Sequence, residues 1–391
     1  MIVLDLSRLL SRSGSLTPSG IDRVELAYAR HLMSGAAPHC FAARDALGGI
    51  GLLPVGAVEE FIAGLAALWR DGAGPREQRR LASLARRLRW AALFGERALH
   101  GAMRGSEGTP VYLLVSHQNL DRARPIARLK AATGARFLCL IHDLIPLDFP
   151  DLTRPGQALR HERRVATVAA LADGGIANSA ATRDALRRRL GQRKMPIAVA
   201  PLGVDLPGVA SSHADGPYFV CIGTIEARKN HFLLFDVWER LTAGLGERPP
   251  CLKLIGRRGF GGDRIADRLK SLRGPVTEHA DLPDAEMARL LQGSRALLLP
   301  SLAEGFGLPV VEALALGVPV LCSDLPALQE SGGGVPDYLD PTDSAAWHRA
   351  VLDYAEDSPR RQAQLARLAG WRPPCWAEHF AIVERLIAEL G

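Results

Sequence analysis

The sequence lacks the patterns of a membrane span, a disulfide framework and a zinc site. No run of eighteen apolar residues occurs, so we expect no transmembrane helix. Residues 1–6 are interpreted as a first strand and not as a signal peptide. The cysteines show no CxxC spacing, and we interpret them as small core residues of a reducing cytoplasm. They are Cys40, Cys139, Cys221, Cys251, Cys322 and Cys375.

Metal and nucleic-acid motifs are also missing. The one candidate for a DxD-type metal pair, Asp281 with Asp284, is better interpreted as part of a loop. We therefore predict that the protein needs no metal and no other cofactor. The formal net charge is +6 at pH 7, but no nucleic-acid-binding motif accompanies it. A nucleic acid partner is not expected.

Much of the positive charge lies in residues 76–104, which hold eight arginines against two glutamates. One face of the expected helix is apolar and holds Leu81, Leu84, Leu88 and Ala92. The pattern predicts a basic amphipathic helix, and two interpretations remain open. In one, the leucine face and Trp90 enter an anionic membrane, or the arginines meet an acidic acceptor. In the other, the helix packs on its own domain and its arginines are solvated.

Expected strands alternate with helical patterns along the chain, which indicates an α/β protein with parallel sheets. The first domain is predicted at 1–205, with strands at 2–6, 111–115, 137–141, 175–177 and 197–199. Residues 206–217 are polar and rich in helix and strand breakers, which is typical of a linker. The second domain is predicted at 218–374, with strands at 218–222, 251–255, 296–299 and 318–322. A last helix is expected in 375–391.

Residues 300–322 predict a strand, a glycine-bearing turn, a helix and a second strand. Pro309 suits the first turn of the helix, and Gly317 ends it. Glu304 is expected on the turn and Glu312 in the first helical turn. The turn also holds Gly305, Phe306, Gly307 and Leu308. A helix N-terminus after glycines attracts phosphate, and carboxylates accept hydrogen bonds from sugar hydroxyls, so this segment predicts a nucleotide-sugar site.

A second motif lies in residues 218–231. A strand ends at Gly223, and a short loop from Thr224 carries Arg228 and Lys229 before an apolar-spaced helix. Arginine offers a planar fork for phosphate and lysine a point charge. Together they predict neutralisation of a diphosphate.

With both motifs in view, the chain resembles the retaining glycosyltransferases of family 4, which have the GT-B fold. The resemblance lies in Glu304, seven residues, Glu312 and the Ala-Leu-Ala-Leu-Gly-Val-Pro-Val run, and in Gly223 with the Arg-Lys pair. It spans nearly the whole chain and is sharp in the second half. It implies two Rossmann-like domains facing a central cleft, with the last helix crossing back to the first domain. Many members carry an arginine where this chain has Thr224.

The resemblance also implies roles for these residues. Arg228 and Lys229 would hold the donor's diphosphate, Glu304 the hydroxyls of the transferred sugar, and Glu312 the ribose diol. In the family, the leaving phosphate is the favoured base for the acceptor hydroxyl. We assign no covalent nucleophile and no metal.

Two loops of the first domain carry further candidates. Gly20 precedes an amphipathic helix that also holds Arg23. The helix N-terminus could face the diphosphate or the acceptor, and simple capping by Ser19 is the alternative.

His142 and Asp143 follow the end of an expected strand, where ligands bind in open α/β sheets. The resemblance puts a histidine at this position, near the transferred sugar. His117 and Asn119 follow another strand end, and these two residues and Arg23 are candidates for the acceptor side.

The two motifs and the family resemblance together imply a retaining, metal-independent hexosyltransferase that uses a nucleotide-diphosphate sugar. The acceptor is expected to be lipid-linked or a polysaccharide in bacterial surface-glycan synthesis, at the cytoplasmic face of the membrane. A GDP-mannose-like donor is preferred because the 223–230 motif resembles mannosyl- and rhamnosyltransferases. The alternatives are a nucleotide-sugar epimerase of GT-B fold and a catalytically silent binding module. Glu304 and Glu312 disfavour the first, and these glutamates with Arg228 and Lys229 disfavour the second.

Overall fold

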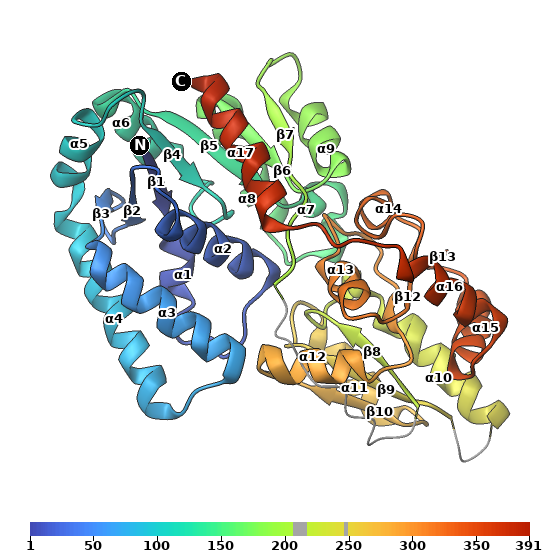
Figure 1. Cartoon of the computed structure of the whole chain (residues 1–391). Helices are drawn as coiled ribbons and strands as arrows, with labels where there is room; N and C mark the ends of the chain where they lie inside the picture. Colours follow the sequence, from blue (N-terminus) through green and yellow to red (C-terminus); the bar gives the residue numbers. More distant parts are fainter. Residues whose placement is uncertain (206–216, 246–248) are drawn as a thin grey trace. The chain divides into compact units, whose positions relative to one another are not determined.

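The computed structural model describes residues 1–205, 217–245 and 249–391, and the chain divides into two α/β units (Figure 1). Unit 1 comprises Met1–Leu147, Ala158–Leu202 and Trp376–Gly391. Unit 2 comprises Asp148–Gln157 and Gly203–Cys375. Of the predicted linker at 206–217, residues 206–216 lie outside the described residues.

Unit 1 is built around a seven-stranded sheet of order β3-β2-β1-β4-β5-β6-β7. Its strands are β1 (Ile2–Asp5), β2 (His39–Arg44), β3 (Ile50–Leu52), β4 (Val111–Leu114), β5 (Arg136–Ile141), β6 (Gly174–Ala177) and β7 (Ile197–Val199). Its helices are α1 (Ser7–Ser11), α2 (Gly20–Ser34), α3 (Val55–Asp71), α4 (Pro75–Phe94), α5 (Glu96–Arg104), α6 (Ala123–Thr133), α7 (Ile145–Asp148), α8 (Gln157–Leu171), α9 (Ala180–Leu190) and α17 (Trp376–Leu390).

The strands of this sheet are parallel except for β3, which pairs antiparallel with β2. Leu4 of β1 is in register with Phe41 of β2 and with Leu113 of β4. The five expected strands of the first domain are present, while β2 and β3 were not predicted. β2 holds three small residues and β3 is three residues long, so neither shows the β-branched pattern of a buried strand.

Unit 2 contains a six-stranded sheet of order β10-β9-β8-β11-β12-β13, parallel throughout. Its strands are β8 (Tyr218–Ile222), β9 (Cys251–Ile255), β10 (Val276–His279), β11 (Leu297–Leu299), β12 (Val320–Ser323) and β13 (Asp337–Leu339). Its helices are η1 (Pro150–Leu152), η2 (Ala227–Lys229), α10 (His231–Leu245), α11 (Gly262–Ser271), α12 (Asp284–Gln292), α13 (Leu308–Ala315), α14 (Pro326–Gly332), α15 (Ser344–Ala355) and α16 (Pro359–Ala369). The edge strands β10 and β13 were not predicted.

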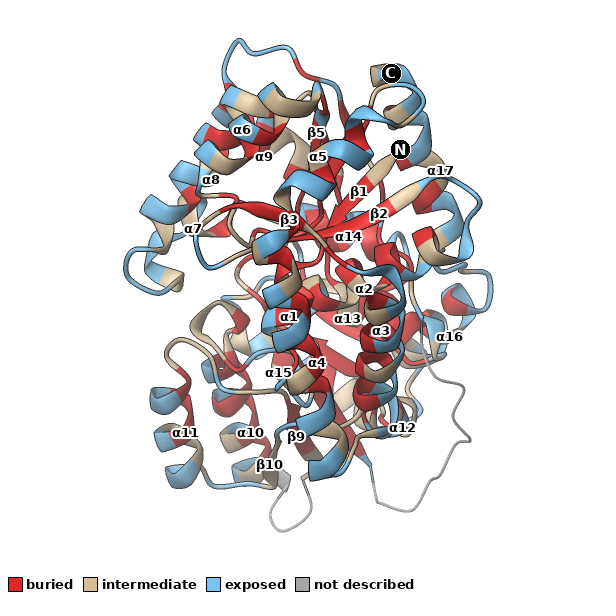
Figure 2. Cartoon of the chain, turned by 90° about the vertical axis from the view of Figure 1, so that its left-hand side faces the viewer, coloured by how far each residue is buried: buried red, intermediate tan, exposed pale blue. Residues whose placement is uncertain are grey.

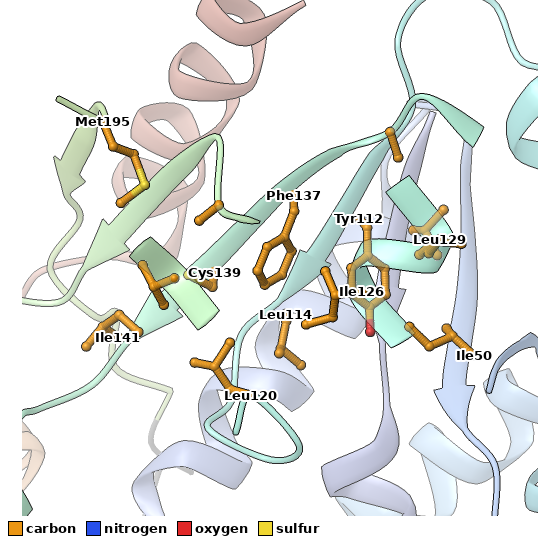
Figure 3. Packing of buried hydrophobic residues seen from close by; sticks show 14 of the residues in the cluster. Ile50, Tyr112, Leu114, Leu120, Ile126, Leu129, Phe137, Cys139, Ile141 and Met195 are labelled. Carbon is orange, nitrogen blue, oxygen red and sulfur yellow. The ribbon is translucent and has the colours of Figure 1, made fainter. Parts of the chain in front are cut away.

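Each unit has its own apolar core. In unit 1, Tyr112 and Leu114 of β4 and Phe137 and Cys139 of β5 belong to one cluster with Ile126 and Leu129 of α6 (Figure 3). In unit 2, the sheet has apolar clusters that draw on α10 and α15 in one case and on α13 and α14 in the other. The cysteines are free, and Cys139, Cys221 and Cys322 are buried in β5, β8 and β12, as expected.

The last helix, α17, packs on β6 and β7 and belongs to unit 1, which confirms the predicted return. Its buried His379 shares a hydrogen bond with the Tyr28 hydroxyl of α2, with 2.7 Å between Nε2 and the oxygen. Phe380 stacks on His31, with ring centroids 3.7 Å apart. The helix therefore covers both the edge of the sheet and α2.

The basic segment forms two helices, α4 and α5, that meet at Gly95. The apolar face of α4 is buried in unit 1: Leu81, Leu84, Leu88 and Ala92 are each 4% exposed or less. The helix lies so close to β3 that a Cβ on Gly51 would be 1.9 Å from the carbonyl oxygen of Ala92.

The prediction that the leucine face enters a membrane is therefore wrong. Each of the three leucines stabilises the unit by about 1.5–3 kcal/mol through burial, and that contribution would be lost if the face turned outward. The opposite face is solvent-exposed. In Figure 2, buried and exposed residues alternate along α4, because one side of the helix is buried and the other faces solvent. Among the described residues, no helix combines the length and apolar content needed to cross a membrane.

Candidate functional site

The motif residues of unit 2 meet at the carboxyl ends of β8 and β11, which are neighbouring strands. The loop after β11 runs beside the loop after β8, because the Leu302 N–H donates to the carbonyl of Arg228 (2.8 Å). Parallel strands bring their carboxyl ends to one edge of a sheet, and ligands of open α/β sheets bind at that edge. The two predicted motifs are therefore one site.

Glu304 lies at the centre of this site. Its Oε1 accepts hydrogen bonds from Lys229 Nζ (2.5 Å) and from the Ser301 hydroxyl (2.7 Å). Its Oε2 accepts from Arg228 (3.1 Å), and the Nε of Arg228 donates to Glu226 (2.6 Å). We call Arg228, Lys229, Glu304 and Ser301 the ion cluster.

The ion cluster is mostly removed from water. The side chains of Lys229 and Glu304 are 6% and 8% exposed, although the sequence places them on a loop and a turn. Burial alone would raise the pKa of Glu304, but the charges of Lys229 and Arg228, with hydrogen bonds from Lys229 and Ser301, lower it to about 2. Glu304 is therefore a carboxylate at neutral pH.

Two glycines shape the loops. Gly223 has a φ of 138°, and a Cβ there would lie 3.1 Å from Cε of Lys229, so its missing side chain leaves room for the lysine. Gly307 has a φ of 94°, and its Cβ would lie 2.4 Å from a methyl carbon of Leu328. Thr224, the departure from the family pattern, directly follows Gly223.

Helix α13 begins at Leu308, directly after Gly305, Phe306 and Gly307. Glu312 is its fifth residue and is buried. The helix begins one residue before Pro309, so Glu312 lies at the start of the second turn, one residue beyond the first-turn position that we predicted.

In unit 1, His142 and Asp143 follow β5 as predicted, and His117 follows β4. His142 is 5% exposed, and its Nε2 donates to the carbonyl of Val115 (2.8 Å). The carboxylate of Asp143 accepts from the Ile145 N–H (3.2 Å) at the start of α7. His117 and His142 are brought together, with ring centroids 5.3 Å apart.

Gly20 opens α2, and its neighbour Ser19 is the N-cap of a capping box with Asp22. Ser19 accepts from the Asp22 N–H (3.3 Å), and the Ser19 N–H donates to the Asp22 carboxylate (2.7 Å). Capping by Ser19, the alternative interpretation of this loop, is present. Arg23 lies in the first turn of α2, and Asn119 is in a left-handed turn with a φ of 60°.

Sequence reasoning missed several residues around these sites. Arg8 and Arg12 both pair with the fully buried Asp22, at 2.6 and 3.1 Å. A capping-box pattern at Ser19 and Asp22 was the one available sequence signal. His161 and Asn178 lie 18 and 36 positions from their partners Asp143 and His142, so they gave no local signal. Glu226, Ser301 and Arg164 are only two or three positions from their partners, but no motif singled them out.

Two families of glycosyltransferases match this chain in sequence. The family "Glycosyl transferases group 1" matches residues 216–357, and "Glycosyltransferase Family 4" matches residues 65–207. The O-antigen chain mannosyltransferase B of Escherichia coli is 33% identical over 152 residues, which are 38% of this chain and 40% of that protein. The MMP alpha-(1->4)-mannosyltransferase of Mycolicibacterium hassiacum is 33% identical over 220 residues, half of each chain. This chain thus matches half or less of the length of both relatives.

A likeness in fold extends further than these sequence matches. Anabaena HepE, solved in complex with UDP-glucose, superimposes with a TM-score of 0.64 at 15% identity, covering 100% of this chain and 98% of HepE. At this level of identity, the likeness concerns the fold.

Proposed function

We propose that this chain, a glycosyltransferase of family 4 type with the GT-B fold, transfers a hexose from a nucleoside-diphosphate sugar to a polysaccharide or lipid-linked acceptor. Mannose from GDP-mannose is the first choice of donor, since both relatives described above are mannosyltransferases. HepE was solved with UDP-glucose, so UDP-sugars are the second choice.

The ion cluster is the observation that carries this proposal. Arg228 and Lys229 place two positive charges at the carboxyl edge of the sheet, near the start of α13. A leaving nucleoside diphosphate gains negative charge as the glycosidic bond breaks, and fixed cations stabilise that charge in the transition state. Glu304 would then accept hydrogen bonds from sugar hydroxyls, and Glu312 from the ribose diol.

The transfer is proposed to retain the anomeric configuration and to need no metal. Two cationic side chains and a helix N-terminus supply positive charge that a divalent ion supplies in other transferases. We expect full turnover in EDTA. A strict requirement for added Mg²⁺ or Mn²⁺ would contradict the metal-independent part of the proposal, and NMR of the product's anomeric proton checks retention.

A donor panel tests the function as a whole. The purified chain is melted with GDP, UDP, dTDP and ADP in turn, and a bound nucleotide raises the melting temperature by mass action. The matching nucleotide sugar is then incubated with lipid-linked and polysaccharide acceptors. Transfer supports the proposal, whereas conversion of the donor to its epimer would identify an isomerase. Binding without turnover of any donor would indicate a silent module.

We further propose that the exposed face of α4 holds the protein at an anionic membrane surface, which would place it at the cytoplasmic side. Trp90 and Phe94, one turn apart, are 65% and 78% exposed. Arg79, Arg86 and Arg87 are exposed on the same side of the helix. We call these five residues the α4 outer face. Each arginine near an acidic lipid surface contributes about 1 kcal/mol, and exposed aromatic rings suit the interface.

Vesicle co-sedimentation tests this contact. The triple variant Arg79→Glu, Arg86→Glu, Arg87→Glu is expected to lose binding to phosphatidylglycerol vesicles, as is Trp90→Ala with Phe94→Ala. Arg80 is left unchanged because it pairs with Glu60 (2.6 Å). The matched control changes the exposed Arg187, Arg188 and Arg189 of α9 to Glu, which alters charge equally on the same unit. Equal losses in both triple variants, or equal binding to neutral vesicles, would reject a specific α4 contact.

A further inference from the structure

Side chains from three other segments of unit 1 hold the backbone of His142 and Asp143. The His142 N–H donates to Nε2 of His117 (3.1 Å), and the His142 carbonyl accepts from Nδ2 of Asn178 (2.9 Å). The Asp143 carbonyl accepts from Nε2 of His161 (3.1 Å). His117 follows β4, His161 lies in α8 and Asn178 follows β6. We call His117, His161 and Asn178 the polar cage.

The hydrogen bonds of the polar cage determine which ring nitrogens carry protons. His117 Nε2 accepts from an amide, so the proton of this ring is on Nδ1. His161 Nε2 donates to a carbonyl, and its Nδ1 accepts from Arg164 (3.2 Å). His142 Nε2 also donates to a carbonyl, that of Val115. His117 and His161 each have one accepting nitrogen, so both rings are neutral and each has one defined tautomer.

Burial and ring packing support this arrangement. His117, His142 and His161 are 6%, 5% and 2% exposed. His117 contacts both other rings edge to face, with centroids 5.3 Å and 5.0 Å away. Burial lowers the pKa of His117 well below its ordinary value and that of His142 to about 4, which favours the neutral rings.

We propose that the polar cage positions His142 and Asp143 against the transferred sugar. His117 and His161 would act through these two residues, so this proposal replaces the prediction that His117 contacts the acceptor. It rests on the proposed function and on the position near the transferred sugar that the family resemblance implies for His142. A cage residue touches no substrate, but its loss lets the His142 backbone move. A displacement of about 1 Å at a reacting centre costs on the order of 100-fold in rate.

Two substitutions of His117 separate positioning from other roles. In His117→Gln, the side-chain carbonyl can still accept from the His142 N–H, whereas His117→Leu cannot. We expect His117→Leu to lower kcat by about 100-fold, with little change in the KM for the donor or the KM for the acceptor. His117→Gln should keep most of the wild-type kcat. Val58→Ala in α3 is the stability control, because Val58 is fully buried in unit 1 and its truncation should lower the melting temperature.

A second measurement reads the hydrogen bond directly and needs no substrate. Amide hydrogen exchange at His142 should be faster in His117→Leu than in the wild type, and near the wild-type rate in His117→Gln. The ¹⁵N spectrum of the His117 ring should show a protonated Nδ1 and an unprotonated Nε2. If the wild type transfers no sugar, the proposed function fails, while these two readouts still test the polar cage.

Several results would overturn the inference. Equal kcat in the Leu and Gln variants would show that the hydrogen bond accepted by His117 does not contribute to the reaction. A raised acceptor KM in both variants would return His117 to the acceptor site. A kcat loss no larger than that of Val58→Ala at the same melting temperature would mean a purely structural role, and a proton on Nε2 of His117 would contradict the geometry.

Discussion

At the residue scale, Glu304 would compete with the proposed donor for the same two cations. Its carboxylate holds Lys229 and Arg228, the two cations proposed to bind the diphosphate. Binding of a donor would therefore exchange one anion for another at these cations, and would release Glu304 to meet sugar hydroxyls. Recognition of the phosphates and recognition of the sugar would then be coupled through one carboxylate.

This coupling predicts opposite effects of Glu304→Gln on two quantities. The variant should bind the free nucleoside diphosphate about tenfold more tightly, because charge-assisted hydrogen bonds to the carboxylate, worth roughly 1.5–3 kcal/mol, no longer compete. Sugar transfer should fall at the same time. Isothermal titration of Glu304→Gln and of Glu278→Gln, which alters an exposed ion pair with Arg258, makes the comparison. Weaker nucleotide binding in Glu304→Gln would show that the carboxylate supports the phosphate site instead.

Lys229 is buried, so its substitution should affect both turnover and stability, and the two effects must be measured separately. Lys229→Met should lower turnover by about 100- to 1000-fold, as expected for the loss of one charge at the leaving group. It should also destabilise the protein, since it leaves Glu304 with fewer partners in a dry site.

Adding Glu304→Gln to Lys229→Met should recover the melting temperature and leave turnover low. Recovery of both quantities would mean that Lys229 serves stability and not the reaction. Thermal unfolding and steady-state kinetics on the single and double variants distinguish the two cases.

At the scale of elements, helix α17 packs against α2. Phe380 is 5% exposed and lies against His31, Tyr28 and Trp376. Phe380→Ala should therefore destabilise unit 1 by about 3–5 kcal/mol, the usual cost of truncating a buried aromatic ring. The control is Phe232→Ala in α10, where the ring is 40% exposed and the loss should be below about 1 kcal/mol. Similar unfolding midpoints for the two variants would show that α17 contributes little to unit 1.

The apolar spacing of α4 predicts a helix but not what its apolar face packs against. Its apolar spacing correctly identified one face of a helix, but the same spacing fits a membrane, a partner or the chain's own sheet. The face is covered by α3, β3 and β2, and the missing side chain of Gly51 in β3 lets the helix approach. None of these three elements was predicted, so the sequence offered no element for the leucines to pack against.

At the scale of the whole molecule, buried titratable groups predict how stability varies with pH. Burial lowers the pKa of His142, His231 and His379 from 6.5 to about 4. Between these values the unfolded chain binds more protons, so stability is lost as pH falls from 6.5 toward 4. Burial of Glu25 raises its pKa from 4.5 to about 8, so the folded chain binds the extra proton and stability is lost as pH rises from 4.5 toward 8.

The two opposing trends place the expected stability maximum near pH 6.5. Below it these three histidines, together with His117, whose pKa burial also lowers, outweigh one glutamate. Above it Glu25 acts with a slope of at most about 1.4 kcal/mol per pH unit. Urea unfolding from pH 5 to pH 8 checks the curve. Glu25→Gln should flatten the branch above pH 6.5, and an unchanged branch in this variant would assign the loss to other groups.

The sequence by itself determined the alternation of strands and helices, the two motif loops and the helical nature of the basic segment. These features depend on residues close together in the chain: glycine and proline at turns, apolar runs in strands and the 3.6-residue period of helices. For the same reason the local pattern alone was enough to place the candidates His142, Asp143, Arg228, Lys229 and Glu304 at strand ends. Their roles in the reaction stay predictions.

Only the tertiary structure decided which of these side chains meet. The pairing of Lys229 with Glu304 joins residues 75 positions apart, and the bond from Asn178 to His142 joins residues 36 positions apart. Such contacts follow from the order of strands in a sheet, which local periodicity does not specify. Burial then sets the charge states, because a carboxylate or a histidine changes its pKa according to the solvent and partners around it. The ion cluster, the polar cage and the buried face of α4 are therefore properties of the folded chain.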